Sequence, residues 1–191
     1  MLKKSLKACL LSLALFSMLI FTAPSVSLAQ DAFPKMAVVD MNGILQRAKA
    51  GKTIQSQLEK KRADYQKQIK KQETALRSAE KVLLKEKGTL SAADFAKKRR
   101  IFEKKVLSAQ KMVHEHKRTL EYGVSVALNV LKKSAAQVVS DIAKERKLSM
   151  IFLKDSVVIA EKSLDITAEA LKRLDAKITK IPITWSLPKK K

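Results

Sequence analysis

The sequence predicts an α+β protein in which a long antiparallel helical hairpin, of coiled-coil type, projects as an arm from a small β-rich body. No proline occurs between Pro34 and Pro182, and Gly88 is the only glycine between Gly51 and Gly123. A single break therefore divides a long helical span. Apolar residues recur at spacings of three and four on both sides of this break. Short apolar runs typical of strands flank the span.

The first 29 residues are expected to be a cleaved signal peptide. Three lysines precede an apolar run at residues 8–21, and Ser27-Leu28-Ala29 is a small-x-small cleavage site, with the cut after Ala29. The run is shorter than the ~20 residues that a membrane-spanning helix needs. The single cysteine, Cys9, leaves with this segment. We therefore expect a mature chain without disulfides, a thiol nucleophile or cysteine-bound metal.

The body begins at residues 35–52. The apolar run at 35–40 predicts a buried strand, and Asn42 or Asp40 can cap a short helix after it. Gly51 is expected to end this helix, and Thr53 to cap the arm.

The arm is assigned to residues 53–123. Its outgoing helix, at ~1.5 Å per residue, spans roughly 50 Å, which is longer than a small domain is wide. Gly88 suits a left-handed helix end, and Ser91 with Asp94 resembles a capping box. The expected seam between the two helices consists of Leu58, Tyr65, Ile69, Leu76, Ala79, Leu83, Leu90, Phe95, Phe102, Val106, Ala109, Val113 and Leu120. This seam is too narrow to form a globular core.

The second part of the body is assigned to residues 124–181, where the apolar stripe widens into a core-forming helix. The runs at 149–153 and 157–160, separated by three residues, predict a β-hairpin. Asp165 is expected to cap a last helix, which Pro182 ends. Residues 182–191 form a C-terminal extension, in which 183–187 are an edge strand or a tail.

Charge points to an acidic partner for the arm. The chain has a net charge of +22, and residues 52–123 contain 20 Lys or Arg against nine Asp or Glu. Any single lysine is equally well explained as part of a solvated helix face. A cluster of like charges, however, costs free energy unless something acidic binds it. The candidate residues for binding this acidic partner lie near the turn and are Lys85, Lys87, Lys97, Lys98, Arg99 and Arg100.

An enzyme is not expected. The four glycines are too far apart for a phosphate-binding loop, which needs glycines within about six residues. His114 and His116 lie two residues apart on a helix and point away from each other, so they do not bind one metal together. We expect His116 in a seam position where its hydrogen-bonding groups are satisfied, and His114 in solvent. No catalytic residue, cofactor or metal is assigned.

These residues resemble the Skp (OmpH) family of periplasmic chaperones. The resemblance rests on the signal peptide, the stretches Met36-Ala37-Val38-Val39-Asp40-Met41-Asn42-Gly43 and Asp165-Ile166-Thr167-Ala168-Glu169-Ala170-Leu171-Lys172, and the order of elements over residues 35–178. It implies a periplasmic homotrimer whose arms surround a cavity. Unfolded outer-membrane proteins would be held there without ATP. The segment 179–191 departs from the family pattern.

The subunit has too little core to be stable alone, which also predicts a homo-oligomer. The candidate oligomerisation residues are Val38, Val39, Ile151, Phe152, Val158 and Ile159. An alternative function is a structural or adaptor coiled coil of the envelope. Nucleic-acid binding fits the charge but neither the export signal nor the 5% aromatic content, so no nucleic-acid partner is expected. Whether lipopolysaccharide or anionic phospholipid also contacts the arm is left open.

Overall fold

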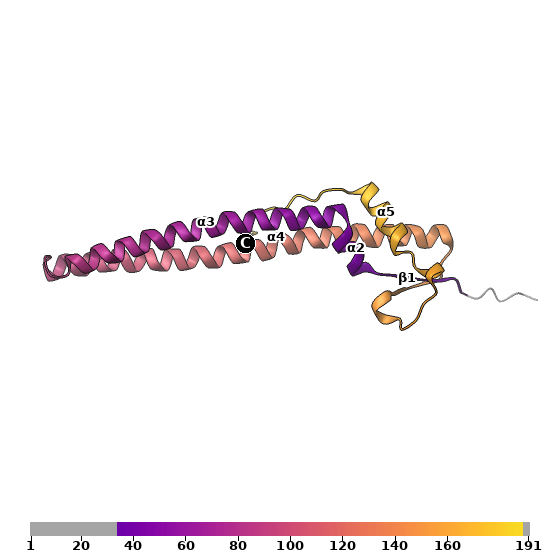
Figure 1. The fold of residues 1–191 in the computed structure, drawn as a ribbon, viewed down its shortest axis with the longest axis horizontal. Helices are drawn as coiled ribbons and strands as arrows, with labels where there is room; N and C mark the ends of the chain where they lie inside the picture. The colour runs from indigo at the N-terminus through magenta and orange to yellow at the C-terminus, as the bar shows by residue number, and fades with distance from the viewer. Residues whose placement is uncertain (1–33, 189–191) are drawn as a thin grey trace, which may run out of the picture. The chain divides into compact units, whose positions relative to one another are not determined.

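The computed structural model describes residues 34–188, and the expected signal peptide lies outside this range. Helices dominate these residues, and α3 and α4 run side by side in opposite directions (Figure 1). The elements are β1 (Met36–Val39), α2 (Met41–Arg47), α3 (Lys49–Glu86), α4 (Ala92–Arg146), β2 (Met150–Leu153), the 3-10 turns η1 (Lys154–Ser156) and η2 (Lys162–Leu164), and α5 (Thr167–Lys177). The predicted helical hairpin is therefore present, but the body is not β-rich.

The long helix α3 begins earlier than predicted, at Lys49. Asp40 caps α2 as expected, because its Oδ1 accepts a hydrogen bond from the Gly43 N–H at 2.6 Å. The break between α2 and α3 falls at Ala48, which is extended at φ −56° and ψ 142°, and not at Gly51. Asp175 of α5 accepts from the Lys49 N–H at 2.7 Å, so a distant carboxylate, and not Thr53, bonds the first turn of α3.

Gly51 lies inside α3 for a packing reason. A Cβ at this position would be 2.0 Å from the Leu45 carbonyl oxygen, so only glycine allows α3 to pass this close to the end of α2.

The tip of the hairpin forms without a left-handed glycine. The N–H groups of Thr89 and Leu90 both donate to the Glu86 carbonyl at 3.1 Å, which closes a right-handed turn. None of the glycines in the described range has a positive φ, so the prediction for Gly88 was wrong. The cap of α4 is confirmed, because Ser91 Oγ accepts from the Asp94 N–H at 3.1 Å and bonds Asp94 Oδ2 at 2.6 Å.

The body contains one small sheet in which β1 and β2 are parallel, with Val38 opposite Phe152. The predicted hairpin at 149–160 is wrong, since β2 is followed by η1 and residues 157–160 form no strand. The whole arm serves as the crossover that parallel strands need. The other side of Val38 bridges to Asp165, so β1 lies between two distant segments.

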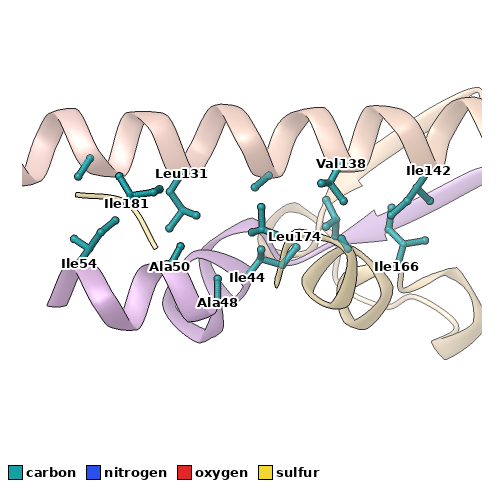
Figure 2. Close-up of a cluster of buried hydrophobic side chains, with 14 of the residues drawn as sticks. Ile44, Ala48, Ala50, Ile54, Leu131, Val138, Ile142, Ile166, Leu174 and Ile181 are labelled. Carbon is teal, nitrogen blue, oxygen red and sulfur yellow. The ribbon is translucent and has the colours of Figure 1, made fainter. Parts of the chain in front are cut away.

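The core lies where α2, α4, α5 and the first turns of α3 meet (Figure 2). Its fully buried large side chains are Ile44, Leu131, Ile142, Ile166 and Leu174. On α3, Tyr65 is the outermost buried residue, and the predicted seam beyond it is only half-buried. Val113 leaves the predicted seam, with 44% exposure, and Met112 takes a half-buried place beside it. The predicted contrast between a thin arm seam and a packed body is present.

The end of the chain also differs from the prediction. α5 begins at Thr167 after Ile166, and Asp165 contributes by accepting from the Thr167 N–H at 2.9 Å. The helix ends at Lys177, before Pro182. Residues 178–188 form neither a strand nor a helix and follow α3 and α4 (Figure 1).

Candidate functional site

The six basic residues singled out near the turn all lie at one end of the helix pair. Lys85 is in the last turn of α3, Lys87 follows it, and the other four occupy the second turn of α4. All six are exposed. Because the turn is short, the two helices bring these charges to one region, as predicted.

Two of the six cations already have acidic partners. Lys98 Nζ lies 2.7 Å from Glu86 Oε1 across the hairpin, and Arg99 Nε lies 3.3 Å from Glu103 Oε1 along α4. Within residues 34–188, no ion pair is found for Lys85, Lys87, Lys97 or Arg100. These four are therefore the cations most available to an external partner.

The apolar part of this site was not predicted from the sequence. Val82, Leu84 and Ile101 are exposed beside the basic residues. A groove of 280 Å³ between the helices is lined by Val82, Leu83, Ile101 and Phe102, with Lys98 and Lys105 at its edge. The sequence could have indicated this apolar surface, because Val82 and Ile101 directly precede the predicted seam residues Leu83 and Phe102. The tip thus offers charge and apolar surface together.

The proposed oligomerisation residues divide into two groups. Val38 and Val39 are buried inside the subunit, the latter at 2% exposure, and Ile151 is half-buried. Val158 and Ile159, by contrast, are 98% and 89% exposed. Phe152, the sixth predicted residue, is also exposed, and it lines one hollow with Met36, Leu164, Val158 and Ile159. Met150 and Leu153 are the other exposed apolar residues of β2. We call these seven residues, with Val158 and Ile159 included, the body patch.

An ion pair closes the loop that carries Val158 and Ile159. Lys154 Nζ lies 2.7 Å from Asp165 Oδ2, and these two residues lie at the two ends of the loop. The hydrogen bond from Lys154, followed by that from Thr167, lowers the pKa of Asp165 to about 2, and the same pair raises the pKa of Lys154. The exposed side chains of Val158 and Ile159 therefore lie on a loop whose two ends are joined by an ion pair.

The described residues contain no group of three or more His, Cys, Asp or Glu side chains that could hold a metal ion. His114 is exposed and His116 is half-buried against Tyr65, as predicted. The His116 position is not satisfied, however, because Nε2 is buried without a hydrogen-bond partner among the described residues. Nor does any helix of residues 34–188 combine the length and apolar content needed to cross a membrane.

Comparison with known proteins agrees with the fold and the order of elements. The family model "Outer membrane protein (OmpH-like)" matches residues 35–174, so the chain belongs to the OmpH-like family. No protein with a curated description matches it. Among solved structures, a proposed outer membrane chaperone (OmpH-like) from Caulobacter crescentus CB15 is similar, with a TM-score of 0.76 and 18% identity. The match covers 82% of this chain and 93% of that one.

Proposed function

We propose that this chain is an ATP-independent periplasmic holdase. It binds unfolded outer-membrane proteins in a cavity between the arms of a homotrimer and keeps them from aggregating on the way to the outer membrane. Membership of the OmpH-like family supports the chaperone role. The long helical arm supports the proposal that the client is held between arms.

The observation that carries the proposal is the mixed surface of the arm tip. Four exposed cations without an acidic partner in the described residues lie close in the sequence to the exposed apolar residues Val82, Leu84 and Ile101. Such a surface makes many weak contacts and no single deep one, so affinity comes from multivalency. It suits an unfolded, net-acidic chain, and the client leaves once its own fold buries the same apolar groups.

The body patch supports self-assembly. Val158, at 98% exposure, and Ile159 beside it expose apolar surface to water, which is unfavourable. A contiguous exposed apolar patch marks an interaction site. The outer edge of β2 is also unpaired within residues 34–188, since β1 is its only partner there. We infer that further copies of this chain cover both features and that the assembled trimer spaces the arms around the client.

The test is suppression of aggregation. A urea-unfolded outer-membrane barrel is diluted into buffer with and without the mature protein, and light scattering is followed without ATP. We expect scattering to fall to the baseline near one trimer per client. Unchanged scattering at a several-fold excess of trimer would overturn the holdase proposal and leave the envelope adaptor as the better explanation.

A further inference from the structure

The segment 178–188, which we call the C-terminal strap, follows the root of the arm in extended form (Figure 1). From Ile181 onward its residues alternate strictly between inward and outward positions. Ile181 and Ile183 are 4% and 8% exposed, and Trp185 and Leu187 are half-buried. The residues between them, Pro182, Thr184 and Ser186, are exposed. Every second side chain therefore packs on the helices, as in a strand lying on a surface.

The polar contacts that hold the strap are made to its backbone. The side-chain amide of Gln57 on α3 donates from Nε2 to the Ile181 carbonyl at 2.9 Å and accepts at Oε1 from the Ile183 N–H at 3.2 Å. One side chain thus bonds a peptide group on each side of Pro182. No backbone–backbone hydrogen bond involves residues 179–187 in the described part of the chain. The recognition is largely independent of which side chains the strap carries.

Gly123 on α4 provides the space beneath the strap. A Cβ at this position would lie 2.9 Å from Ile183 Cγ2, 3.0 Å from the Thr184 carbonyl oxygen and 3.2 Å from Trp185 Cε3. The helix surface is therefore shaped for close approach of an extended chain. Gln57 and Gly123 together form a surface that binds extended backbone and accepts an apolar side chain at every second position.

The same alternation of apolar and polar residues defines strands of outer-membrane barrels. We propose that the surface formed by Gln57 and Gly123 is a binding site for extended polypeptide, that the strap is its resident occupant, and that unfolded client strands displace it. This inference rests on the proposed function and adds a defined site at the root of the arm. Tethering gives the strap an effective concentration in the millimolar range, so only a client held by other contacts as well competes with it.

Trp185 reports the displacement directly, because it is the only tryptophan in the chain. Two tryptophan-free probes are titrated into the full mature protein. One is an unfolded outer-membrane barrel, and the other is a synthetic peptide of residues 178–188 carrying Trp185→Phe. We expect the emission of Trp185 to shift to the red, and its side chain to become more accessible to iodide, as the barrel saturates. The peptide, which has no other contacts, should produce the same change only in the millimolar range.

Variants separate the strap from the surface beneath it. Ile183→Ser weakens the strap and leaves the surface intact. The same synthetic peptide, now carrying a fluorescent label, should therefore bind this variant about ten-fold more tightly than wild type, as loss of a buried isoleucine predicts. Gln57→Ala should weaken peptide binding in the Ile183→Ser background. Ser186→Ala, at an exposed strap position, is the matched control and should behave as wild type.

The outcomes distinguish this inference from the holdase proposal. If the client stays soluble while Trp185 emission and iodide quenching do not change, the strap remains bound when the client binds. This result would reject the displacement proposal and leave the holdase proposal standing. If the client aggregates, the holdase proposal fails, and peptide binding to Ile183→Ser still decides the site. Absence of peptide binding to both wild type and Ile183→Ser would overturn the site itself.

Discussion

The ring of Tyr65 on α3 stacks on the ring of His116 on α4, with centroids 3.7 Å apart and an angle of 2° between the planes. Lys61 Nζ lies 4.8 Å from the centroid of the same tyrosine. Within the described residues, His116 Nε2 is buried without a hydrogen-bond partner. The stack closes the well-packed root of the arm, since the seam beyond Tyr65 is only half-buried.

This stack should weaken on acidification. Burial and then Lys61 lower the pKa of His116 below its usual 6.5, partly opposed by Glu115. The unfolded arm therefore binds the proton more readily than the folded one. The histidine's stabilising effect is present above pH ~6.5 and is lost as pH falls through the folded-state pKa.

Hydrogen exchange around Tyr65 measures the effect. After correction for intrinsic rates, we expect protection to decrease between pH 7.5 and 5.5 in the wild type. The decrease should be smaller in His116→Gln. In the exposed control His114→Gln it should be as large as in the wild type. Equal pH responses in all three proteins would contradict the assignment to His116.

Protection along the arm should rise from the tip to the root. The distal seam is half-buried, whereas Ala127, Leu131 and Ala135 on α4 are almost fully buried. Local opening is easier where few apolar contacts are lost. Exchange measured by mass spectrometry should be fastest near Gly88 and slow progressively toward Gly123. Uniform protection along both helices would show that the arm opens as one unit.

The body patch can be separated from the core by two substitutions. Ile151→Asp places a charge in a half-buried position of β2 and should unfold the body, at a cost of a few kcal/mol. Val158→Asp alters an exposed side chain, so it should lower the mass in solution and make the melting temperature depend more steeply on concentration.

The control for these two variants is Ala168→Asp at an exposed position of α5, which should retain mass and stability. Mass is measured by multi-angle light scattering at micromolar concentrations. A Val158→Asp protein with wild-type mass and melting temperature would remove the body patch from the assembly interface.

Reversal of the tip charges should impair capture and leave the fold intact. Changing Lys97, Lys98, Arg99 and Arg100 together to Glu should slow client capture most at low salt, because exposed charges act over a Debye length of ~8 Å at physiological ionic strength. Lys97 and Arg100 lack ion pairs in the described residues, so reversing these two alone should produce much of the effect. Exposed ion pairs contribute ~1 kcal/mol or less, so melting should barely change.

The matched control reverses two exposed lysines of α5, Lys172 and Lys177. Capture rates are compared by stopped-flow fluorescence across a salt series. If the α5 reversal slows capture as much as the tip reversal, the effect comes from net charge alone. Identical rates for all variants at low salt would assign the tip cluster to a solvated helix face.

Asp165 should stabilise the body above its folded-state pKa. That pKa is lowered from 3.8 to about 2 by Lys154 and Thr167, so the contribution is complete above pH ~4 and is lost as pH falls through about 2. Asp165→Asn should lower the free energy of unfolding by roughly 1–2 kcal/mol at pH 7. Urea denaturation at pH 7 and pH 2 measures this.

The difference between Asp165→Asn and the wild type should shrink at the lower pH. Asp155→Asn in the same loop is the control, because Asp155 makes only an exposed 3.2 Å bond with Asn42. An equal loss of stability from both substitutions would contradict a special role for Asp165.

The sequence by itself determined the helical hairpin and its contrast with the body. Helices form through bonds between residues four apart, so the absence of proline and the cap at Ser91 were sufficient to place α3, the turn and α4. The basic tip also followed, because a hairpin brings together whatever precedes and follows its turn. The exact start of α3 did not follow, because the Asp175 carboxylate of the distant helix α5 accepts from the Lys49 N–H.

Only the tertiary structure decided which apolar runs become core. Val39 and Val158 lie in similar β-branched runs, yet one is 2% and the other 98% exposed. The strand partner of β2 is β1, more than a hundred residues away, and not the run that follows it. The alternation of Ile181 and Ile183 is visible in the sequence, but the surface that receives them is formed by Gln57 and Gly123. These two residues lie under the same segment only because α3 and α4 pack against each other. Such long-range packing depends on the surfaces of both helices, which the sequence of the strap does not reveal.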